Sequence, residues 1–149
     1  MATVYPTATG NWSTRTWNND ATGAAYGMAP QTGDIVLANG TTVTIDANIT
    51  VVEIATRAGT TAAAGGGFTA SGTRTINANI SAGTTDCLVV SSSSSAITIV
   101  GNLTGGGTSL AVAVNYSAAS SATLVITGNV TGGTTTSCIG LLASAGSSS

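Results

Sequence analysis

Few side chains of this 149-residue chain could carry out chemistry. Its three basic residues are all Arg and it has no His, which excludes histidine catalysis and histidine metal ligation. The five acidic residues are Asp20, Asp34, Asp46, Glu53 and Asp86. Glycoside cleavage uses two carboxylates that face one bond, and the last three of these residues fall at different positions of the repeat described below. We therefore predict no catalytic, cofactor-binding or metal-binding residue, no cofactor and no enzyme activity.

The charge balance excludes two further classes of function. The formal net charge is −2, and three Arg cannot neutralise a row of nucleic-acid phosphates. No apolar run approaches the ~18 residues of a membrane-spanning helix, so we expect neither nucleic-acid binding nor membrane insertion. Residues 1–7 lack the cationic start and the apolar stretch of a secretory signal, which favours synthesis without export by that route.

An internal repeat centred on Asn indicates how the chain is organised. Each copy has Ile three residues before the Asn and a branched aliphatic residue directly after it. The Asn residues, spaced by 31, 23 and 27 positions, are Asn48, Asn79, Asn102 and Asn129. The matching Ile residues are Ile45, Ile76, Ile99 and Ile126.

A second strand pattern follows each of the last three Asn residues, at positions +8, +10 and +12, as in Cys87, Val89 and Ser91. A unit this short cannot bury its apolar residues alone, whereas stacked copies bury a continuous core. We therefore predict an all-β, single-stranded parallel β-helix over residues 33–149, with about four coils of which the last is incomplete.

The stacking assigns a position to each residue of the repeat. We expect the four Ile residues to form a core ladder. We expect the four Asn amides to point inward and to bond to one another from coil to coil. The Thr or Ser two positions after each Asn should point outward, as a neutral solvated surface or as a hydroxyl row for ice or carbohydrate.

The two cysteines are predicted to be free thiols. The repeat places Cys87 and Cys138 two coils apart, which is roughly 10 Å at a strand spacing of about 4.8 Å. A disulfide requires Cα atoms within about 7 Å of each other. Free thiols fit a reducing compartment.

The Asn-centred repeat resembles that of parallel β-helices with an asparagine ladder, over about residues 33–149. Right-handed coiling is usual in that family. Residues 1–32 depart from the repeat and carry Trp12, Trp17 and Tyr26, ahead of an entry segment that begins with Gly33 and Asp34. This arrangement resembles the start of β-helical bacteriophage structural proteins and of some bacterial surface β-helices. We interpret residues 1–32 as a cap or attachment segment whose aromatic residues cover the open end of the solenoid, stack on a sugar or dock to a partner.

The resemblance implies a non-enzymatic virion structural protein of a bacteriophage, either a tail-fibre or spike subunit or a capsid decoration or head-fibre protein. Its expected partners are other virion proteins, a host surface glycan and copies of itself, with a trimer implied by the resemblance alone. It would be made in the host cytoplasm and located in the virion. The sequence stops after Ser149, before a further strand, which fits a longer fibre or a neighbouring subunit. The alternatives are a bacterial cell-surface β-helical adhesin or repeat-protein fragment, and an enzyme acting on polysaccharide.

Overall fold

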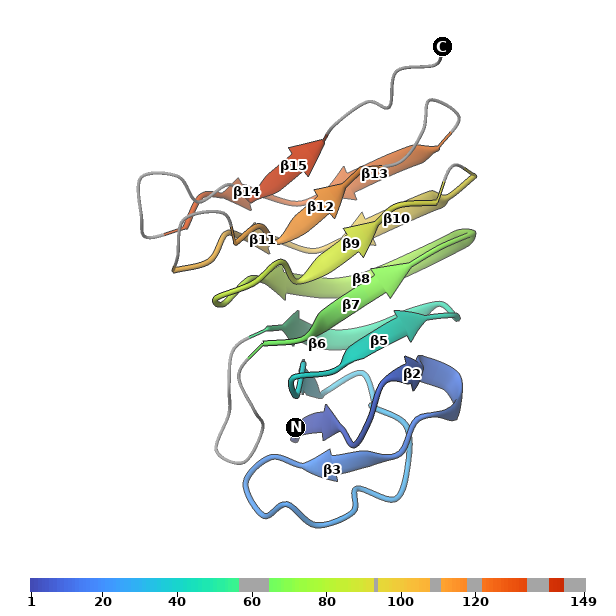
Figure 1. The fold of residues 1–149 in the computed structure, drawn as a ribbon, viewed down its shortest axis with the longest axis vertical. Helices are drawn as coiled ribbons and strands as arrows, with labels where there is room; N and C mark the ends of the chain where they lie inside the picture. The colour runs from blue at the N-terminus through green and yellow to red at the C-terminus, as the bar shows by residue number, and fades with distance from the viewer. Residues whose placement is uncertain (57–64, 93, 108–110, 118–121, 134–139, 144–149) are drawn as a thin grey trace.

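Two stacked β-sheets make up the fold (Figure 1). The computed structural model describes residues 1–56, 65–92, 94–107, 111–117, 122–133 and 140–143. From residue 35 onward the described strands pair in parallel with strands of neighbouring coils, as the chain passes back and forth between the sheets. The predicted all-β parallel solenoid is therefore confirmed, with about three turns.

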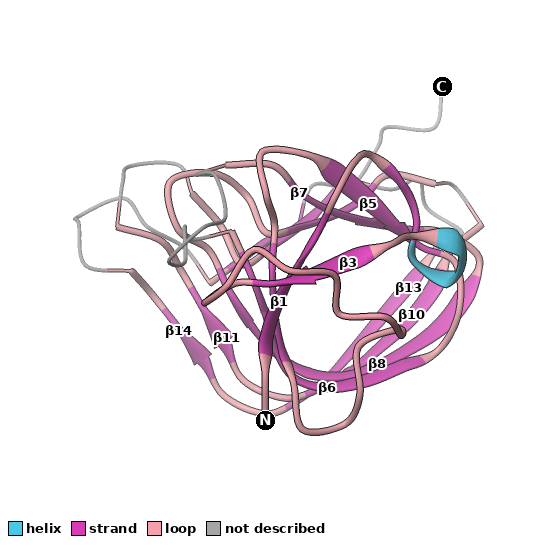
Figure 2. Ribbon diagram, turned by 90° about the horizontal axis from the view of Figure 1, so that it is seen from below, coloured by secondary structure: helices cyan, strands magenta, loops and turns pink. Residues whose placement is uncertain are grey.

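The strands form two layers that face each other across the interior when viewed along the stack (Figure 2). The first sheet contains β1 (Thr3–Pro6), β3 (Trp17–Asn19), β4 (Ile35–Leu37), β6 (Ile49–Ala55), β8 (Thr73–Ser81), β10 (Ala96–Val100), β11 (Leu103–Thr104), β13 (Thr123–Thr127) and β14 (Val130–Thr131). The second sheet contains β2 (Gly10–Asn11), β5 (Thr42–Ile45), β7 (Gly67–Ala70), β9 (Leu88–Val90), β12 (Val114–Tyr116) and β15 (Leu141–Ala143). The described residues also include a 3-10 turn, η1 (Trp12–Thr14), and no helix long and apolar enough to cross a membrane.

The Ile residues of the repeat form a column in the first sheet. Ile99 of β10 is in register with Ile76 of β8 on one side and with Ile126 of β13 on the other. Ile76 and Ile99 are completely buried, because alternate residues of a strand point to the same face and this face is covered by the second sheet. The spacing of the repeat therefore gave the correct register for these three coils.

The prediction for Ile45 is wrong, because Ile45 belongs to the other sheet. It ends β5, where its register partner is Ala70 of β7. The position next to Ile76 is occupied by Ile49 of β6. A bulge in β6 between Thr50 and Glu53 then shifts the register further. An alignment centred on Asn48 therefore pairs residues of the first copy of the repeat with the wrong residues of the next coil.

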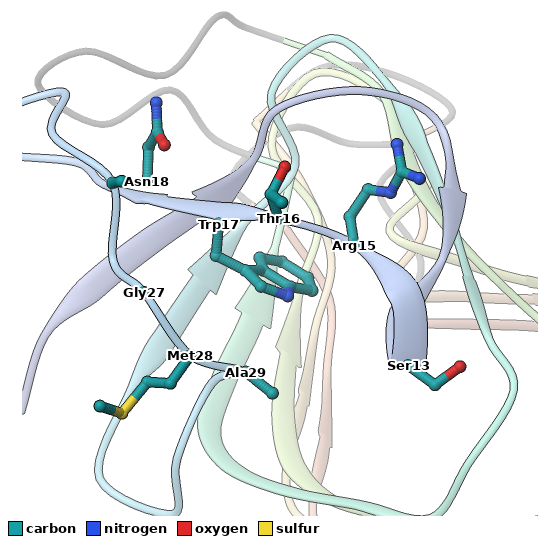
Figure 3. Close-up of a pocket in the computed structure, with 9 residues that line it drawn as sticks. Ser13, Arg15, Thr16, Trp17, Asn18, Gly27, Met28 and Ala29 are labelled. Atoms are coloured by element: carbon teal, nitrogen blue, oxygen red, sulfur yellow. The ribbon is translucent and has the colours of Figure 1, made fainter.

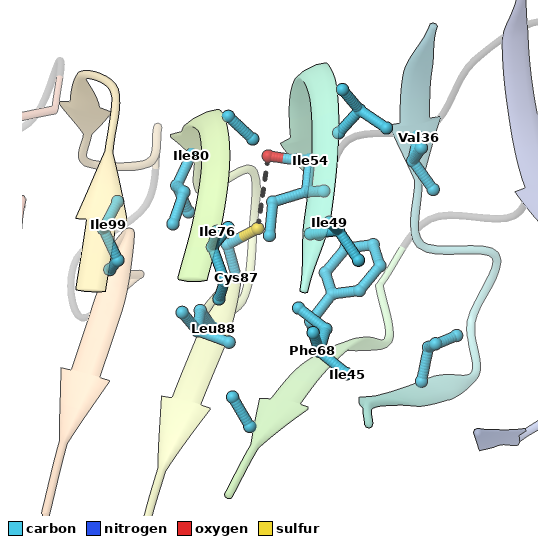
Figure 4. Close-up of a cluster of buried hydrophobic side chains, with 14 of the residues drawn as sticks. Val36, Ile45, Ile49, Ile54, Phe68, Ile76, Ile80, Cys87, Leu88 and Ile99 are labelled. Carbon is cyan, nitrogen blue, oxygen red and sulfur yellow. Dashed lines mark hydrogen bonds between the residues drawn. The ribbon is translucent and has the colours of Figure 1, made fainter. Parts of the chain in front are cut away.

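The core between the sheets is continuous and almost entirely apolar (Figure 4). Phe68 and Leu88 pair in register in the second sheet and both are buried against Ile residues of the first. Of the predicted inward residues Cys87, Val89 and Ser91, only Cys87 is buried. Leu88 and Val90 of β9 point inward instead, while Val89 is half-buried and Ser91 is exposed.

The stacking begins before residue 33. β1 pairs in parallel with β4, and β2 pairs in parallel with β5, so the segment predicted as a separate cap contributes strands to both sheets. Among the strands that the structure describes, only β3 pairs antiparallel, with β1 at the end of the first sheet. The boundary at residue 32 therefore separates a repeating sequence from a non-repeating one within continuous sheets.

Candidate functional site

The aromatic residues of the amino-terminal segment extend the core. Trp12 lies on η1 and Trp17 begins β3, and their side chains are only 5% and 2% exposed. The two indole rings are 4.8 Å apart between centroids and tilted by 59°, and Trp12 also contacts Phe68 at 6.3 Å. Neither ring presents an open face, so stacking of a sugar on these two residues is not supported, whereas the covering of the solenoid end is.

The chain that follows β3 includes residues 24–29, here called the covering segment, and its first three residues cover the outer edge of β3. Tyr26 donates its backbone N–H to the Trp17 carbonyl at 2.7 Å, and Asn19 donates to the Ala24 carbonyl at 2.8 Å. Asn18 forms a single antiparallel bridge with Ala25. The free backbone groups of an open edge strand can pair with another chain. Here residues 24–26 already bond to backbone groups of β3.

A buried carboxylate fastens this covering segment to the first coil. Asp34, 3% exposed, accepts hydrogen bonds from the Tyr26 hydroxyl (2.6 Å), the Gln31 backbone N–H (2.8 Å) and the Ala2 backbone N–H (2.9 Å). Burial alone would raise the pKa of Asp34, but these hydrogen bonds outweigh it and lower that pKa. The bond to Asp34 in turn raises the pKa of Tyr26.

A pocket of about 290 Å³ lies beside Trp17 (Figure 3). The 3-10 turn and the residues after it supply Ser13, Arg15 and Thr16, β3 supplies Trp17 and Asn18, and the covering segment supplies residues 25 and 27–29. Tight local turns bring these parts together, since Gly27 adopts φ +79°, which favours glycine. The pocket is thus built wholly from the non-repeating part of the sequence.

Two residues that line this pocket each carry a buried hydrogen-bond donor without a partner among the described residues. Trp17 Nε1 and Arg15 Nε make no hydrogen bond among the described residues. The Arg15 guanidinium lies against Gly10, where a Cβ atom would come within 2.9 Å of Cζ. Figure 3 shows the Arg15 guanidinium pointing away from the indole nitrogen, so the two donors do not face one point of the pocket. The pocket is the candidate binding site of the chain because of its volume and its lining.

The Asn residues of the repeat do not point into the core. Asn48, Asn79, Asn102 and Asn129 are all exposed, which contradicts the predicted inward ladder of amides. Asn79 Oδ1 accepts the backbone N–H of Asn102 at 2.9 Å, and Asn102 Oδ1 accepts that of Asn129 at 3.0 Å. The Asn side chains therefore join coils by bonding to the next backbone at the surface.

Two details of these hydrogen bonds between Asn side chains and the next coil were not predicted from the sequence. Asn48 Oδ1 accepts the backbone N–H of Thr75 instead of that of Asn79, as the shifted register of β6 requires. Gly101 and Gly128 precede the last two Asn residues because a Cβ there would lie 2.0 and 2.2 Å from a carbonyl of the preceding coil. The recurring Gly-Asn pair is the signal that marks this surface corner.

The carboxylates lie at separate places and form structural contacts. Asp46 accepts from the backbone N–H and the hydroxyl of Ser13, and the Ser13 hydroxyl is the main cause of its lowered pKa. Asp86 accepts from the Val112 backbone at 3.0 Å and from Asn115 Nδ2 at 2.7 Å. In the described part of the chain, no group of three His, Cys, Asp or Glu residues is placed to hold a metal ion.

Cys87 is a free, buried thiol in the core. Its Sγ contacts the carbonyl of Ile54 at 3.5 Å (Figure 4), and burial raises its pKa. A thiol that stays protonated is a poor nucleophile and a poor metal ligand. The predicted counterpart, Cys138, lies outside the described residues.

Comparison with family models, with curated proteins and with solved structures finds no match to this chain.

Proposed function

We propose that this chain is a non-enzymatic structural protein of a bacteriophage virion, as a tail-fibre or spike subunit or as a capsid decoration or head-fibre protein. The observation that carries the proposal is the stack of parallel strands in register, from β1 to β13 in one sheet and from β2 to β15 in the other. Such a stack grows along one axis and each coil contacts mainly its neighbours. A rod of this kind suits mechanical roles and the display of a surface.

The outer face of the first sheet supports a role in assembly. Outward positions of β8, β10 and β13 carry Thr, Ser, Asn, Ala and Val and no charged residue. Val100 and Val125 are 44% and 53% exposed on this face, and Asn77 donates to the Thr50 hydroxyl at 3.2 Å. Because charges on a β surface oppose contact with another chain, the uncharged part of this face, from β8 to β13, suits contact with copies of the chain or with other virion proteins; Glu53 of β6 lies next to Asn79 at its border.

The ionisable side chains support a role without catalysis. Asp34, Asp46 and Asp86 each accept hydrogen bonds from backbone N–H groups. Carboxylates held in this way organise loops. A host surface glycan remains a proposed partner of the assembled rod, and the virion its proposed location.

Immunogold electron microscopy of phage particles tests the proposal, with an antibody raised against the whole chain. Gold at one defined position, either along the tail or over the capsid, is the expected result. Gold on the surface of uninfected bacteria would favour the alternative, a cell-surface β-helical adhesin. A chain found only as a free monomer in the particle-free fraction of the lysate would refute the virion role.

A further inference from the structure

The last described strands leave apolar side chains exposed at one end of the stack. β13, β14 and β15 lie together at the end opposite the amino-terminal segment (Figure 1). Val130 of β14 is 51% exposed, although its register partner Leu103 in the preceding coil is completely buried. Leu124 and Ile126 of β13 are half-buried, whereas their register partners in β10 are buried. These side chains occupy core positions that a further layer would cover.

The outer edge of β13 also carries backbone groups that can pair. β13 is the last strand in the order of the first sheet, and no described strand pairs with its outer edge. Thr123 donates its backbone N–H to the Ser95 carbonyl at 2.8 Å, on the side of β10. Because the backbone groups of successive residues point to opposite edges of a strand, those of Leu124 and Ile126 lie on the outer edge. Such groups accept a further strand.

The sequence of β13 fits a second copy of itself. It reads Thr-Leu-Val-Ile-Thr, which is nearly the same in both directions. In an antiparallel pair centred on Val125, Leu124 of one copy lies opposite Ile126 of the other. Each of these two pairs faces the core and exchanges two backbone hydrogen bonds, because both residues direct their backbone groups to this edge. The two Val125 side chains meet on the outer face, in the kind of pair in which side chains lie closest.

Charge and the opposite end of the stack also favour this arrangement. The side chains after Asp86 are all uncharged, so two identical ends meet without repulsion between like charges. A head-to-tail contact within the first sheet would need the outer edge of β3, to which residues 24–26 already bond. The β13 edge therefore suits the β13 edge of another chain better than the opposite end of the stack.

We propose that two copies of the chain associate end to end through β13, with the strands antiparallel about a two-fold axis at Val125. The first sheet then runs continuously through both copies, and Leu124 and Ile126 are covered by their counterparts. Each copy uses its β13 edge once, so the assembly closes at two chains. This contact does not depend on the proposed place in a virion, which the labelling of phage particles tests separately.

Charged residues placed at the two-fold axis test the pairing on the full chain. The parent chain should show twice the mass of one chain, which is 14.3 kDa, in light scattering. Val125→Lys and Val125→Glu should each have the mass of one chain, because like charges then lie directly opposite each other. An equal mixture of the two variants should return to the mass of two chains, because each pair then joins opposite charges. Val125 is 53% exposed, so both variants should fold, which circular dichroism checks.

Val100→Lys is the matched control. Val100 lies on the same outer face and is 44% exposed, but it belongs to β10, one strand away from the edge. This variant should keep the mass of two chains. Loss of the dimer in Val100→Lys as well would place the contact on the outer face and overturn the end-to-end pairing.

The parent chain alone provides a second measurement, which requires no variant to fold. In a mixture of isotope-labelled and unlabelled chains, filtered NMR spectra should show contacts between Leu124 of one copy and Ile126 of another. The absence of these contacts would overturn the proposal. A parent chain with the mass of one or of three chains, or a mixture of folded Val125→Lys and Val125→Glu chains that stays monomeric, would also overturn it.

Discussion

The amino-terminal cap and the repeating coils are stabilised in different ways. In the coils, the same contact recurs at each level, as in the column of Ile76, Ile99 and Ile126. In the cap, the contacts occur once each: two tilted indoles and a buried carboxylate with three donors. A further coil is stabilised when the same residue type recurs at the same position. The closed end of the stack instead depends on specific side-chain contacts that occur nowhere else among the described residues.

This difference also separates the proposed roles of the two regions. The coils offer a regular outer face that is uncharged from β8 to β13 and suits assembly, and the described residues place the pocket in the cap. The following substitutions test whether the coils depend mainly on apolar burial and the cap on polar bonds.

Removal of one member of the Ile column should have the largest effect. Ile99→Ala leaves a cavity between two neighbouring coils in a fully buried position, and we expect a loss of about 2–5 kcal/mol in the free energy of unfolding. Ile126→Ala in the same column is the matched control, with a smaller loss because Ile126 is half-buried. Urea unfolding followed by circular dichroism measures both, and an Ile99→Ala variant as stable as the parent chain would show that the column is not the source of stability.

Removal of the Asp34 charge should have a smaller effect on the cap. Asp34→Asn keeps the shape but weakens the bonds from Tyr26, Gln31 and Ala2, for an expected loss of about 2 kcal/mol. Tyr26→Phe removes only one of the three donors and should cost less. Urea unfolding monitored by Trp fluorescence measures both, because the two indoles lie in the cap; a neutral Asp34→Asn variant would contradict this role.

The same carboxylate should make stability depend on pH. The pKa of Asp34 is lower in the folded chain than in the unfolded one, so ionisation favours the folded state. This contribution is complete above the usual Asp pKa of about 4 and is lost as the pH falls through the lower folded value. The stability difference between the parent chain and Asp34→Asn should therefore shrink in urea titrations below about pH 4. Parallel pH profiles would exclude this linkage.

The exposed Asn connection should have the smallest effect. Asn102→Ala removes the acceptor of the Asn129 N–H, and because the side chain is exposed we expect a loss of only about 1 kcal/mol. Asn102→Asp retains an oxygen acceptor at the same place and should stay closer to the parent chain in thermal unfolding. A loss as large as that of Ile99→Ala would indicate that the amide is buried after all.

The sequence allowed the fold class to be predicted because the Ile spacing repeats. It failed at Ile45, since a bulge and a change of sheet are invisible in a pattern of residue types. It also failed for the Asn side chains. Asn79 lies within β8, where Ile76, Ala78 and Ile80 point inward, so alternation places Asn79 on the outer face. At the Gly-Asn corners of Asn102 and Asn129 the strand ends, and the amide turns to the surface.

The pocket could not be predicted for a related reason. Its residues come from segments without a repeat, and Trp17 has the same residue type whether its N–H is bonded or unmet. Burial of Trp12 and Trp17 follows from their size and from the open end of the sheets, whereas the lack of a partner for Nε1 depends on the path of residues 25–29.

A crystal structure of the chain would test the central claim most directly, through the Cα positions of Ile76, Ile99 and Ile126. Our account predicts that successive Cα atoms lie about 4.8 Å apart, in one line within one sheet, with Ile49 instead of Ile45 next to Ile76. Ile residues scattered over different sheets, or paired with other partners, would contradict it.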